Sequence, residues 1–404
     1  MAKTILRNEP FGAVYFNQAT GRMVMVDTDG FFTLLKFLKE DRLTEKEQKF
    51  ASFFFNDMTP QKIELRIDRS IKPTNNYFIP ITKTPVLIDL SLNNYCNLYC
   101  EYCYMSAKPI PKGSHLSMDD FKVILDQMRK AKVLQIALGG GEPTLHPHFV
   151  EILTKLRLEG DIIPNYTTNG SHLTEEILNA TKQHCGAVAV SYSKKREKET
   201  KSAVKKFLSY GIQTNMHLVL LKSRIPRLAQ ITEHYAQLGI SNIVLLLFKP
   251  MGRGAALTNE ILTAADFRIL ARELLKILTL RKKYGLRLSI DACSSFIVKD
   301  FPFLPQSIEC CTGALTSAYI DWNLNMKPCS FMQEIPGVDL THYNIIDAWY
   351  SPLFERFRQT LLHPRYQGCI SCQHFVSCLS GCPITPKIVF CESKGSELDL
   401  EVRI

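Results

Sequence analysis

Between Pro85 and about Ala292, apolar runs of strand length alternate with stretches of helical periodicity. The apolar runs are VLIDLSL, VLQIALG, IIPNYTT, AVAVSYS, QTNMHLVLL and NIVLLLF, and helical segments begin between them near Ser117, His148, Thr174, Glu199 and Pro226. Strands that alternate with helices pair in parallel, because each crossover helix returns the chain to the same end of the sheet. The pattern therefore predicts a parallel α/β sheet or partial barrel, with its chemistry at the C-terminal ends of the strands.

The segments on either side of this alternation have a different composition. Residues 1–66 begin with two β-rich runs around the turn Gln18–Gly21, followed by the helical stretch FFTLLKFLKE and a second helix that begins at a Thr44/Glu47 capping box. Residues 67–84 are rich in Pro and Asn and predict a linker. Residues 85–290 form the alternating region. Residues 291–404 are dense in cysteine and poor in long periodic elements, which predicts a domain shaped by metal.

Thirteen cysteines are unusual in a chain that begins MAKTILRNEP, without the apolar core of a secretory signal. The longest apolar run, NIVLLLF, is too short to span a bilayer, so we expect a soluble cytoplasmic protein with no membrane partner. Disulfides are rare in that compartment, and an odd number of cysteines cannot pair completely. Metal binding explains these thiols better.

The formal charge of +10 suggests nucleic acid as a partner, but this figure counts every cysteine as neutral. Metal-bound cysteines are thiolates and lower the net charge. The densest basic run, Lys194–Lys206, also contains glutamates, as expected for a solvated helix face. We therefore do not expect nucleic acid binding.

The segment after the first predicted strand, NNYCNLYCEYCY, holds three cysteines spaced Cys96-x3-Cys100-x2-Cys103. Structural zinc sites use four protein ligands, often as two separated pairs, and a compact triplet fits them poorly. A four-iron cluster normally takes one thiolate per iron. Three cysteines would leave one iron open to a substrate or cofactor.

With Tyr102 before the third cysteine, this segment resembles the motif of the radical S-adenosylmethionine (SAM) enzymes over about residues 85–290. The likeness implies an α/β fold with a partial (β/α)6 TIM-like barrel, a [4Fe–4S] cluster, and reductive cleavage of SAM to a 5′-deoxyadenosyl radical that abstracts a substrate hydrogen. GGGEPTLHP resembles the motif that holds the methionyl amine of SAM, TTNG and VSYS follow the next strands where the family contacts SAM, and FKPMGRG would lie beside the adenine. The SAM-binding residues implied are Tyr102, Gly140, Gly141, Glu142, Thr168, Asn169, Ser191 and Ser193.

The cysteines after residue 291 resemble the SPASM extension of some radical SAM enzymes, which carries two further four-iron clusters. CTGALTSAYIDWNLNMKPCSF would be its opening strand pair. By this likeness one cluster takes Cys311, Cys329, Cys382 and either Cys293 or Cys310. We choose Cys293, because adjacent residues of an extended chain point to opposite faces, so Cys310 and Cys311 should not both reach one cluster. The second cluster takes Cys369, Cys372, Cys378 and Cys391, for three [4Fe–4S] clusters in all.

Two cysteines and one serine stand outside this ligand set. Cys185, at a helix end, is expected to be a small buried hydrophobe, and Cys310 is an alternative ligand or a substrate-facing thiol. Sulfatase-maturing relatives place an aspartate after the cysteine that corresponds to Cys329, where it can act as a base. Here Ser330 follows Cys329, which argues against formylglycine formation. The catalytic base cannot be chosen from the sequence.

Residues 1–66 resemble the winged-helix-like α+β domain that binds leader peptides in many maturases of ribosomally made peptides. There an extended leader adds a strand to the sheet edge; the alternative is a structural cap. We expect a peptide maturase that forms a thioether or C–C cross-link in a precursor peptide with a leader segment, with flavodoxin or ferredoxin as electron donor. The alternatives are an enzyme that acts on a small molecule or a tRNA, and a non-catalytic iron–sulfur protein. An intact cysteine triplet and GGE motif argue against the last.

Overall fold

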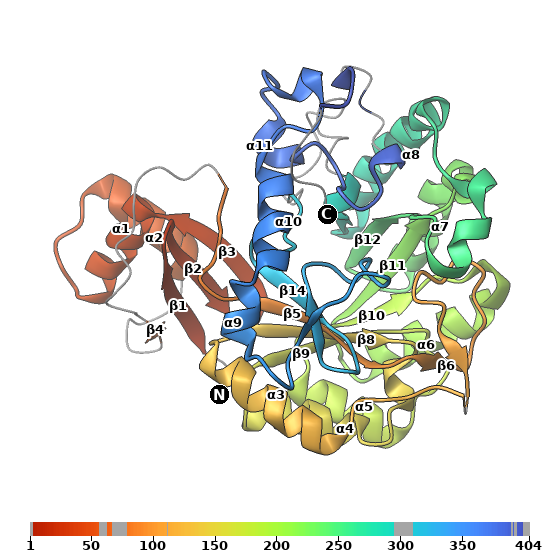
Figure 1. The fold of residues 1–404 in the computed structure, drawn as a ribbon, viewed down its shortest axis with the longest axis horizontal. Helices are drawn as coiled ribbons and strands as arrows, with labels where there is room; N and C mark the ends of the chain where they lie inside the picture. The colour runs from red at the N-terminus through yellow and green to blue at the C-terminus, as the bar shows by residue number, and fades with distance from the viewer. Residues whose placement is uncertain are drawn as a thin grey trace. The chain divides into compact units, whose positions relative to one another are not determined.

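The computed structural model describes residues 3–55, 63–66, 79–110, 112–294, 310–388, 391 and 394–398. It contains two compact units, Met1–Val86 and Leu87–Ile404 (Figure 1). The division at Val86 lies close to the predicted start of the barrel at residue 85. The predicted boundary between residues 290 and 291 falls inside the second unit and stays a prediction.

The first unit is a four-stranded sheet with two helices. Its elements are β1 (Thr4–Glu9), β2 (Gly12–Asn17), β3 (Arg22–Asp27), α1 (Thr28–Leu38), α2 (Glu45–Phe55) and β4 (Ile63–Arg66). The strand order is β3-β2-β1-β4, and only the β1–β4 pair is parallel. The predicted hairpin is β2–β3 and both predicted helices are present. The sequence pattern did not reveal β1 and β4, because TILRNE and IELR are short and contain charges.

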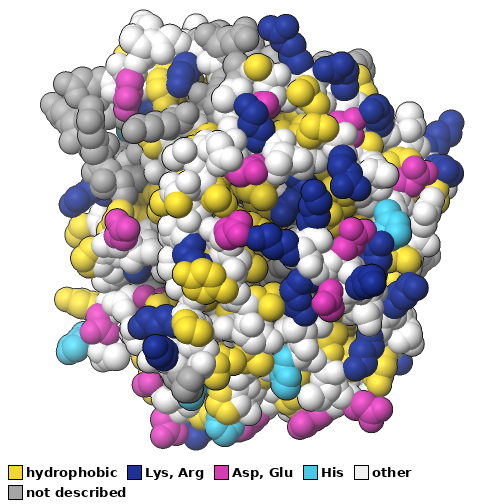
Figure 2. Space-filling model, turned by 90° about the vertical axis from the view of Figure 1, so that its right-hand side faces the viewer, with side chains coloured by type: hydrophobic (Ala, Val, Ile, Leu, Met, Phe, Trp, Pro, Cys, Tyr) yellow, Lys and Arg dark blue, Asp and Glu magenta, His cyan; other side chains and the backbone are white. Residues whose placement is uncertain are grey.

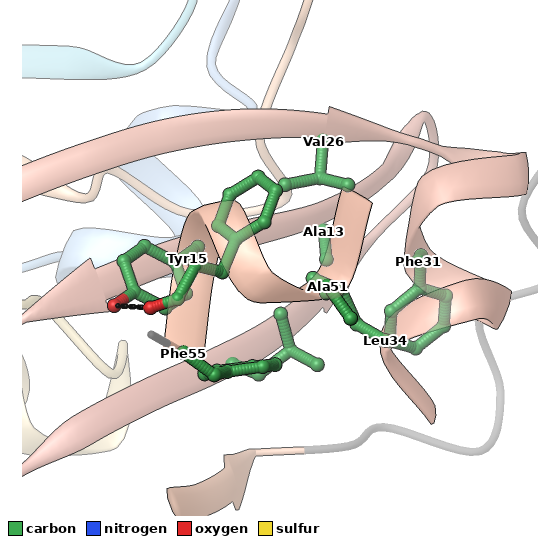
Figure 3. Close-up of a cluster of buried hydrophobic side chains, with 9 residues drawn as sticks. Ala13, Tyr15, Val26, Phe31, Leu34, Ala51 and Phe55 are labelled. Carbon is green, nitrogen blue, oxygen red and sulfur yellow. Dashed lines mark hydrogen bonds between the residues drawn. The ribbon is translucent and has the colours of Figure 1, made fainter. Parts of the chain in front are cut away.

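The core of this unit lies between the sheet and the helices. Figure 3 shows side chains from both layers meeting there, with Tyr15 next to Phe55. The Tyr15 hydroxyl donates a hydrogen bond to the Phe54 carbonyl oxygen at 2.9 Å, which satisfies the phenol inside the core. At the start of α2, the Glu47 N–H donates to Thr44 Oγ1 and the Thr44 N–H donates to Glu47 Oε2, so the predicted capping box forms.

The second unit is built on a parallel sheet whose strands match the predicted apolar runs. The strands are β5 (Leu87–Asn93), β8 (Gln135–Gly140), β9 (Ile163–Thr168), β10 (Val188–Ser191), β11 (Thr214–Leu220), β12 (Asn242–Leu247) and β13 (Arg287–Ile290). They pair in this order, each parallel to the next. The first six confirm the predicted partial barrel. The seventh, β13, was not predicted as a strand.

The helices of this unit lie along the outside of the sheet (Figure 1). They are α3 (Met118–Lys130), α4 (Phe149–Leu158), α5 (Glu175–His184), α6 (Glu197–Ser209), α7 (Leu228–Gln237) and α8 (Ala264–Tyr284), with the 3-10 turns η2 (Pro143–Leu145), η3 (Lys194–Arg196), η4 (Lys222–Arg227), η5 (Gly252–Ala256) and η6 (Thr258–Glu260). Ser117 and Thr174 cap α3 and α5 by accepting hydrogen bonds from Asp120 N–H and Ile177 N–H. Both predicted helix starts are therefore confirmed.

Strand periodicity decides which side chains face the inside of the barrel. In β11, the sequence TNMHLVL alternates buried and half-buried positions, so Met216 and Leu218 pack beneath the helices while His217 points to the opposite face. In β5, Ile88 and Leu90 are buried and Asp89 lies between them. Strands with mostly apolar sequences therefore place polar side chains inside the barrel.

The C-terminal segment continues the same sheet. Its elements are β14 (Ser317–Ile320), β15 (Asn325–Lys327), β16 (Val338–Asp339), α9 (Ile345–Trp349), α10 (Pro352–Leu362), η8 (Gln367–Cys369), α11 (Phe375–Cys378) and η9 (Pro386–Ile388). Strand β14 pairs in parallel with β5, and β15 returns antiparallel to β14. This hairpin is the predicted opening strand pair. Among the residues of this segment that the structure describes, the 11-residue helix α10 departs from the expectation of few periodic elements.

The surface carries both signs of charge. Figure 2 shows lysines and arginines interspersed with acidic side chains on the face it displays. The basic run Lys194–Lys206 forms η3 and most of α6, where Lys201 Nζ lies 2.8 Å from Glu197 Oε1. This run is the solvated helix face that its sequence predicted. In the part of the chain that the structure describes, no helix is long and apolar enough to cross a membrane.

Candidate functional site

The three clustered cysteines lie in the loop that follows β5. Cys96 lies on the short strand β6 (Tyr95–Cys96), which pairs with β7 (Lys108–Pro109). Cys100 and Cys103 follow in a tight turn closed by a Cys103 N–H to Cys100 carbonyl hydrogen bond of 3.3 Å. Local backbone bonds thus fix the path of the loop.

Arg253, in η5 after β12, holds this loop by three hydrogen bonds. Its Nε donates to the Cys100 carbonyl at 2.9 Å, its Nη1 donates to the Ala107 carbonyl at 2.7 Å, and its backbone N–H donates to the Cys103 carbonyl at 3.0 Å. A Cβ at Gly252 would lie 2.3 Å from the Tyr104 carbonyl oxygen, so this close approach requires glycine. The sequence placed FKPMGRG beside the adenine and did not indicate these hydrogen bonds.

Gly140 and Gly141 let the end of β8 approach the cysteine loop. Gly140 has φ of 118°, which favours glycine. A Cβ on Gly141 would lie 1.8 Å from the Tyr95 carbonyl oxygen. The Gly141 N–H donates to the Asn93 carbonyl at 2.9 Å, and the Glu142 N–H donates to the Tyr95 carbonyl at 2.9 Å. The glycines therefore hold two strand ends in backbone contact.

The Glu142 carboxylate is buried and ties neighbouring strand ends together. Its Oε1 accepts hydrogen bonds from the Thr144 and Thr168 hydroxyls at 2.7 Å each, and its Oε2 accepts from the Asn169 N–H at 2.7 Å. Burial raises the pKa of this carboxyl, against these hydrogen bonds, which lower it. Protein donors therefore already engage both oxygens of the residue that the resemblance assigns to the SAM amine.

The other predicted SAM contacts lie at consecutive strand ends. Asn169 Nδ2 donates to Cys96 Sγ at 3.5 Å, which joins the TTNG segment to the cysteine loop. The hydroxyls of Ser191 and Ser193, at the end of β10, form no hydrogen bond with the described residues and are open to a ligand. Tyr102 turns toward the same strand end, where its hydroxyl lies 3.5 Å from the Tyr192 carbonyl. The structure thus brings together the predicted residues of the cysteine loop and of three strand ends.

Three ionisable side chains that the sequence did not single out belong to the barrel strands or follow one directly. Asp89 is on β5, His217 is on β11, and Lys249 follows β12. Burial lowers the pKa of His217 to about 4, so its imidazole is neutral at pH 7, and its Nδ1 lies 3.4 Å from Thr167 Oγ1. The available signal was a charged or polar residue within each otherwise apolar run.

Asp89 lies opposite Tyr319 of β14 in the strand register. The described residues give its carboxyl group no hydrogen bond and no ion pair. Desolvation raises the pKa of Asp89 from 3.8 to about 6. An unpaired interior carboxyl destabilises the fold once it ionises.

We expect Asp89→Asn to stabilise the protein at pH 8 by up to about 3 kcal/mol, because a shift from 3.8 to about 6 makes ionisation costly in the folded state. The folded pKa lies above the unfolded one, so the destabilisation is complete above about pH 6 and disappears as the pH falls toward 4. Denaturant unfolding of both proteins across this range measures the difference. The same difference at pH 4 and pH 8 would contradict an origin in ionisation.

The second cysteine set has a buried group around Cys382. The thiols of Cys293 and Cys382 share a hydrogen bond, which lowers the pKa of Cys382. Burial raises the pKa of Cys329 to about 11, and the charges of Cys329 and Cys382 also act on Cys311. The four residues that the resemblance assigned to one cluster therefore lie near one another, although they come from distant parts of the chain.

The remaining cysteines lie in short helical turns. Cys369 ends η8, Cys378 ends α11, and the Cys372 N–H donates to the Cys369 carbonyl at 3.3 Å between them. Cys185 caps α5 and is half-buried, and desolvation raises the pKa of its thiol. Among the described residues, no three His, Cys, Asp or Glu side chains converge on a single metal-ion position. A four-iron cluster makes no such demand, since each thiolate binds a different iron.

Known proteins resemble this chain in sequence and in fold. The model of the Radical SAM superfamily matches residues 90–193. The PqqA peptide cyclase of Gluconobacter oxydans is 23% identical over 318 residues, which are 74% of this chain and 85% of the relative. The mycofactocin maturase MftC of Mycolicibacterium smegmatis is 24% identical over 319 residues, 74% of this chain and 78% of the relative.

The fold is shared with a solved structure over nearly the whole chain. The crystal structure of Streptococcus suis SuiB bound to precursor peptide SuiA superposes with a TM-score of 0.71 at 17% identity, and covers 98% of this chain and 100% of that one. The segment that the family model matches contains the cysteine loop and the strand ends from Gly140 to Ser193. That family implies a [4Fe–4S] cluster and SAM, for which the three free thiols and the two unpaired serine hydroxyls are suitable partners. The chain therefore contains a radical SAM domain at residues 90–193 and is an enzyme.

Proposed function

We propose that this enzyme is a maturase that forms a thioether or C–C cross-link in a ribosomally made precursor peptide. The observation that carries the proposal is the combination, in one chain, of the radical SAM site with an N-terminal sheet that has an open edge strand. The fold shared with SuiB, which was solved with its precursor peptide, supports it over the full length.

The chain's own residues would prepare the reaction. Cys96, Cys100 and Cys103 would hold a [4Fe–4S] cluster, and Arg253 would fix the loop that carries them. Ser191 and Ser193 would donate to the SAM ribose or carboxylate. When bound, the cluster and SAM supply a carbon-centred radical that removes one hydrogen atom from the substrate. The barrel would orient the peptide and exclude water and competing hydrogen donors.

The first unit offers a place for the leader segment of the peptide. Strand β3 lies at one edge of the four-stranded sheet, and most of its residues are half-buried, whereas β1 and β2 are buried throughout. An edge strand presents unpaired backbone groups that an extended peptide can pair with. A cavity of about 670 Å³ beside α1 and α2, lined by Phe37, Leu43 and Phe55 among others, could receive an apolar side chain.

Two further [4Fe–4S] clusters complete the proposal. The first would be held by Cys293, Cys311, Cys329 and Cys382. We prefer Cys293 to Cys310 because the Cys293 thiol shares a hydrogen bond with the Cys382 thiol. Cys369, Cys372, Cys378 and Cys391 would hold the second. A flavodoxin or ferredoxin would supply electrons. A cross-link removes two hydrogens from the peptide, one as an atom to the SAM-derived radical and one as a proton, and an oxidised cluster would accept the remaining electron.

We expect reconstituted protein with SAM, a reductant and a precursor peptide encoded beside its gene to yield 5′-deoxyadenosine and a peptide lighter by two hydrogens. Mass spectrometry measures the peptide product. Deletion of residues 1–66 should abolish leader binding, as measured by fluorescence anisotropy. If the deletion changes neither binding nor product, the first unit does not recognise the peptide. If SAM is cleaved in the presence of a small molecule or a tRNA but with no precursor peptide tested, the result would favour a small molecule or a tRNA as the substrate.

A further inference from the structure

Lys249 is buried beside the cysteine group around Cys382. Its side chain is 2% exposed, and its Nζ lies 3.7 Å from Asp291 Oδ2. The same ammonium lies 3.6 Å from the centroid of the Phe331 ring, two residues after Cys329. Residues from three separate segments thus enclose one positive charge.

The local partners of Lys249 do not satisfy its ammonium. An ammonium carries three N–H donors, yet no described residue accepts a hydrogen bond from Lys249. Asp291 is partly exposed and beyond hydrogen-bond distance. Burial lowers the pKa of Lys249, but the charges of Asp291, Cys293, Cys382 and Cys329 outweigh burial and raise it well above the ordinary value. Asp291 and negatively charged cysteines at these positions therefore favour the charged form of Lys249.

Lys327 provides a comparison within the same region. It is also buried, but its Nζ donates to the Gln333 carbonyl at 3.3 Å and lies 3.8 Å from Asp321 Oδ2. The ammonium of Lys327 therefore has a carbonyl acceptor, whereas no described residue accepts a hydrogen bond from Lys249. Iron-bound thiolates would add negative charge around the Lys249 ammonium, which neutral thiols do not.

We propose that Lys249 is a positioning charge for the cluster held by Cys293, Cys311, Cys329 and Cys382, and that it raises the reduction potential of this cluster. The inference rests on the proposed cluster assignment. Reduction adds one negative charge to a cluster that is already anionic, and a nearby cation stabilises the reduced state more than the oxidised one. A raised potential suits a cluster that accepts an electron from the substrate radical. The Phe331 ring and the buried position keep water from screening the charge.

The test uses full-length protein with Cys96, Cys100 and Cys103 replaced by alanine, so that only the two C-terminal clusters remain. Redox titration followed by electron paramagnetic resonance measures each midpoint potential. We expect Lys249→Met to decrease the ratio of reduced to oxidised cluster at least tenfold at fixed potential. This corresponds to about 59 mV for a one-electron couple. One of the two cluster signals should shift and the other should stay.

Three controls separate charge from packing. Lys249→Arg should keep the potential near the wild-type value, and Lys327→Met should not move it. Lys249→Gln keeps a polar head group without the charge and should shift the potential in the same direction as Lys249→Met. If Lys249→Met loses iron, Lys249→Gln takes its place in the test. An unshifted potential in a fully loaded Lys249 variant overturns the inference and leaves the proposed function intact. Iron analysis that finds no cluster at these cysteines in the parent protein overturns both.

Discussion

Replacement of Gly141 by alanine is expected to weaken SAM binding at least about a hundredfold, equivalent to about 3 kcal/mol. The added Cβ would lie 1.8 Å from the carbonyl oxygen and 2.3 Å from the carbonyl carbon of Tyr95. Both are backbone atoms of the segment that carries Cys96, so no side-chain rotation relieves the clash. The end of β8 must then move away from the cysteine loop. This movement separates the predicted SAM contacts after β8 from the predicted cluster ligands. Equilibrium dialysis with SAM under anaerobic conditions measures the loss.

Gly139 is the matched control, two residues earlier and within β8. A Cβ there meets no atom within 4 Å. Gly139→Ala should therefore change SAM affinity by less than about threefold. Equal losses in the two variants would show that the effect comes from the strand and not from its approach to Tyr95.

Replacement of Cys100 by alanine should abolish 5′-deoxyadenosine formation and remove about four iron atoms per chain, one cluster's worth. Two thiolates cannot hold a four-iron cluster that already has one iron without a protein ligand. Iron analysis and chromatography of the nucleoside product measure the two effects. Any C-terminal clusters should remain, because their cysteines lie on other segments.

Cys185→Ala serves as the control for cysteine loss. Cys185 is the C-cap residue of α5 and belongs to none of the predicted cluster ligand sets, and burial raises the pKa of its thiol. The variant should retain its iron and its SAM cleavage, with a modest loss of stability. Loss of iron from Cys185→Ala would contradict the division of the thirteen cysteines into ligands and non-ligands.

Much of the barrel could be predicted from local pattern. Apolar runs such as QTNMHLVLL bury one face of a strand, and the caps at Ser117 and Thr174 satisfy the first turns of their helices. Strand β13 was missed because four residues with a charged first position give a weak periodic signal. Strand β4 was missed because it also has only four residues and contains Glu64 and Arg66, and its parallel partner β1 is far away in the sequence.

The sequence by itself determined the order of strands and helices and the Cys96-x3-Cys100-x2-Cys103 spacing, because both depend on residues close together in the chain. Only the tertiary structure decided that Arg253 holds the cysteine loop, that Cys293 shares a hydrogen bond with Cys382, and that Lys249 lies near that pair. These contacts join segments from different strand ends. A periodicity of two tells which face a side chain takes, but only the closure of the sheet decides which distant residues meet there.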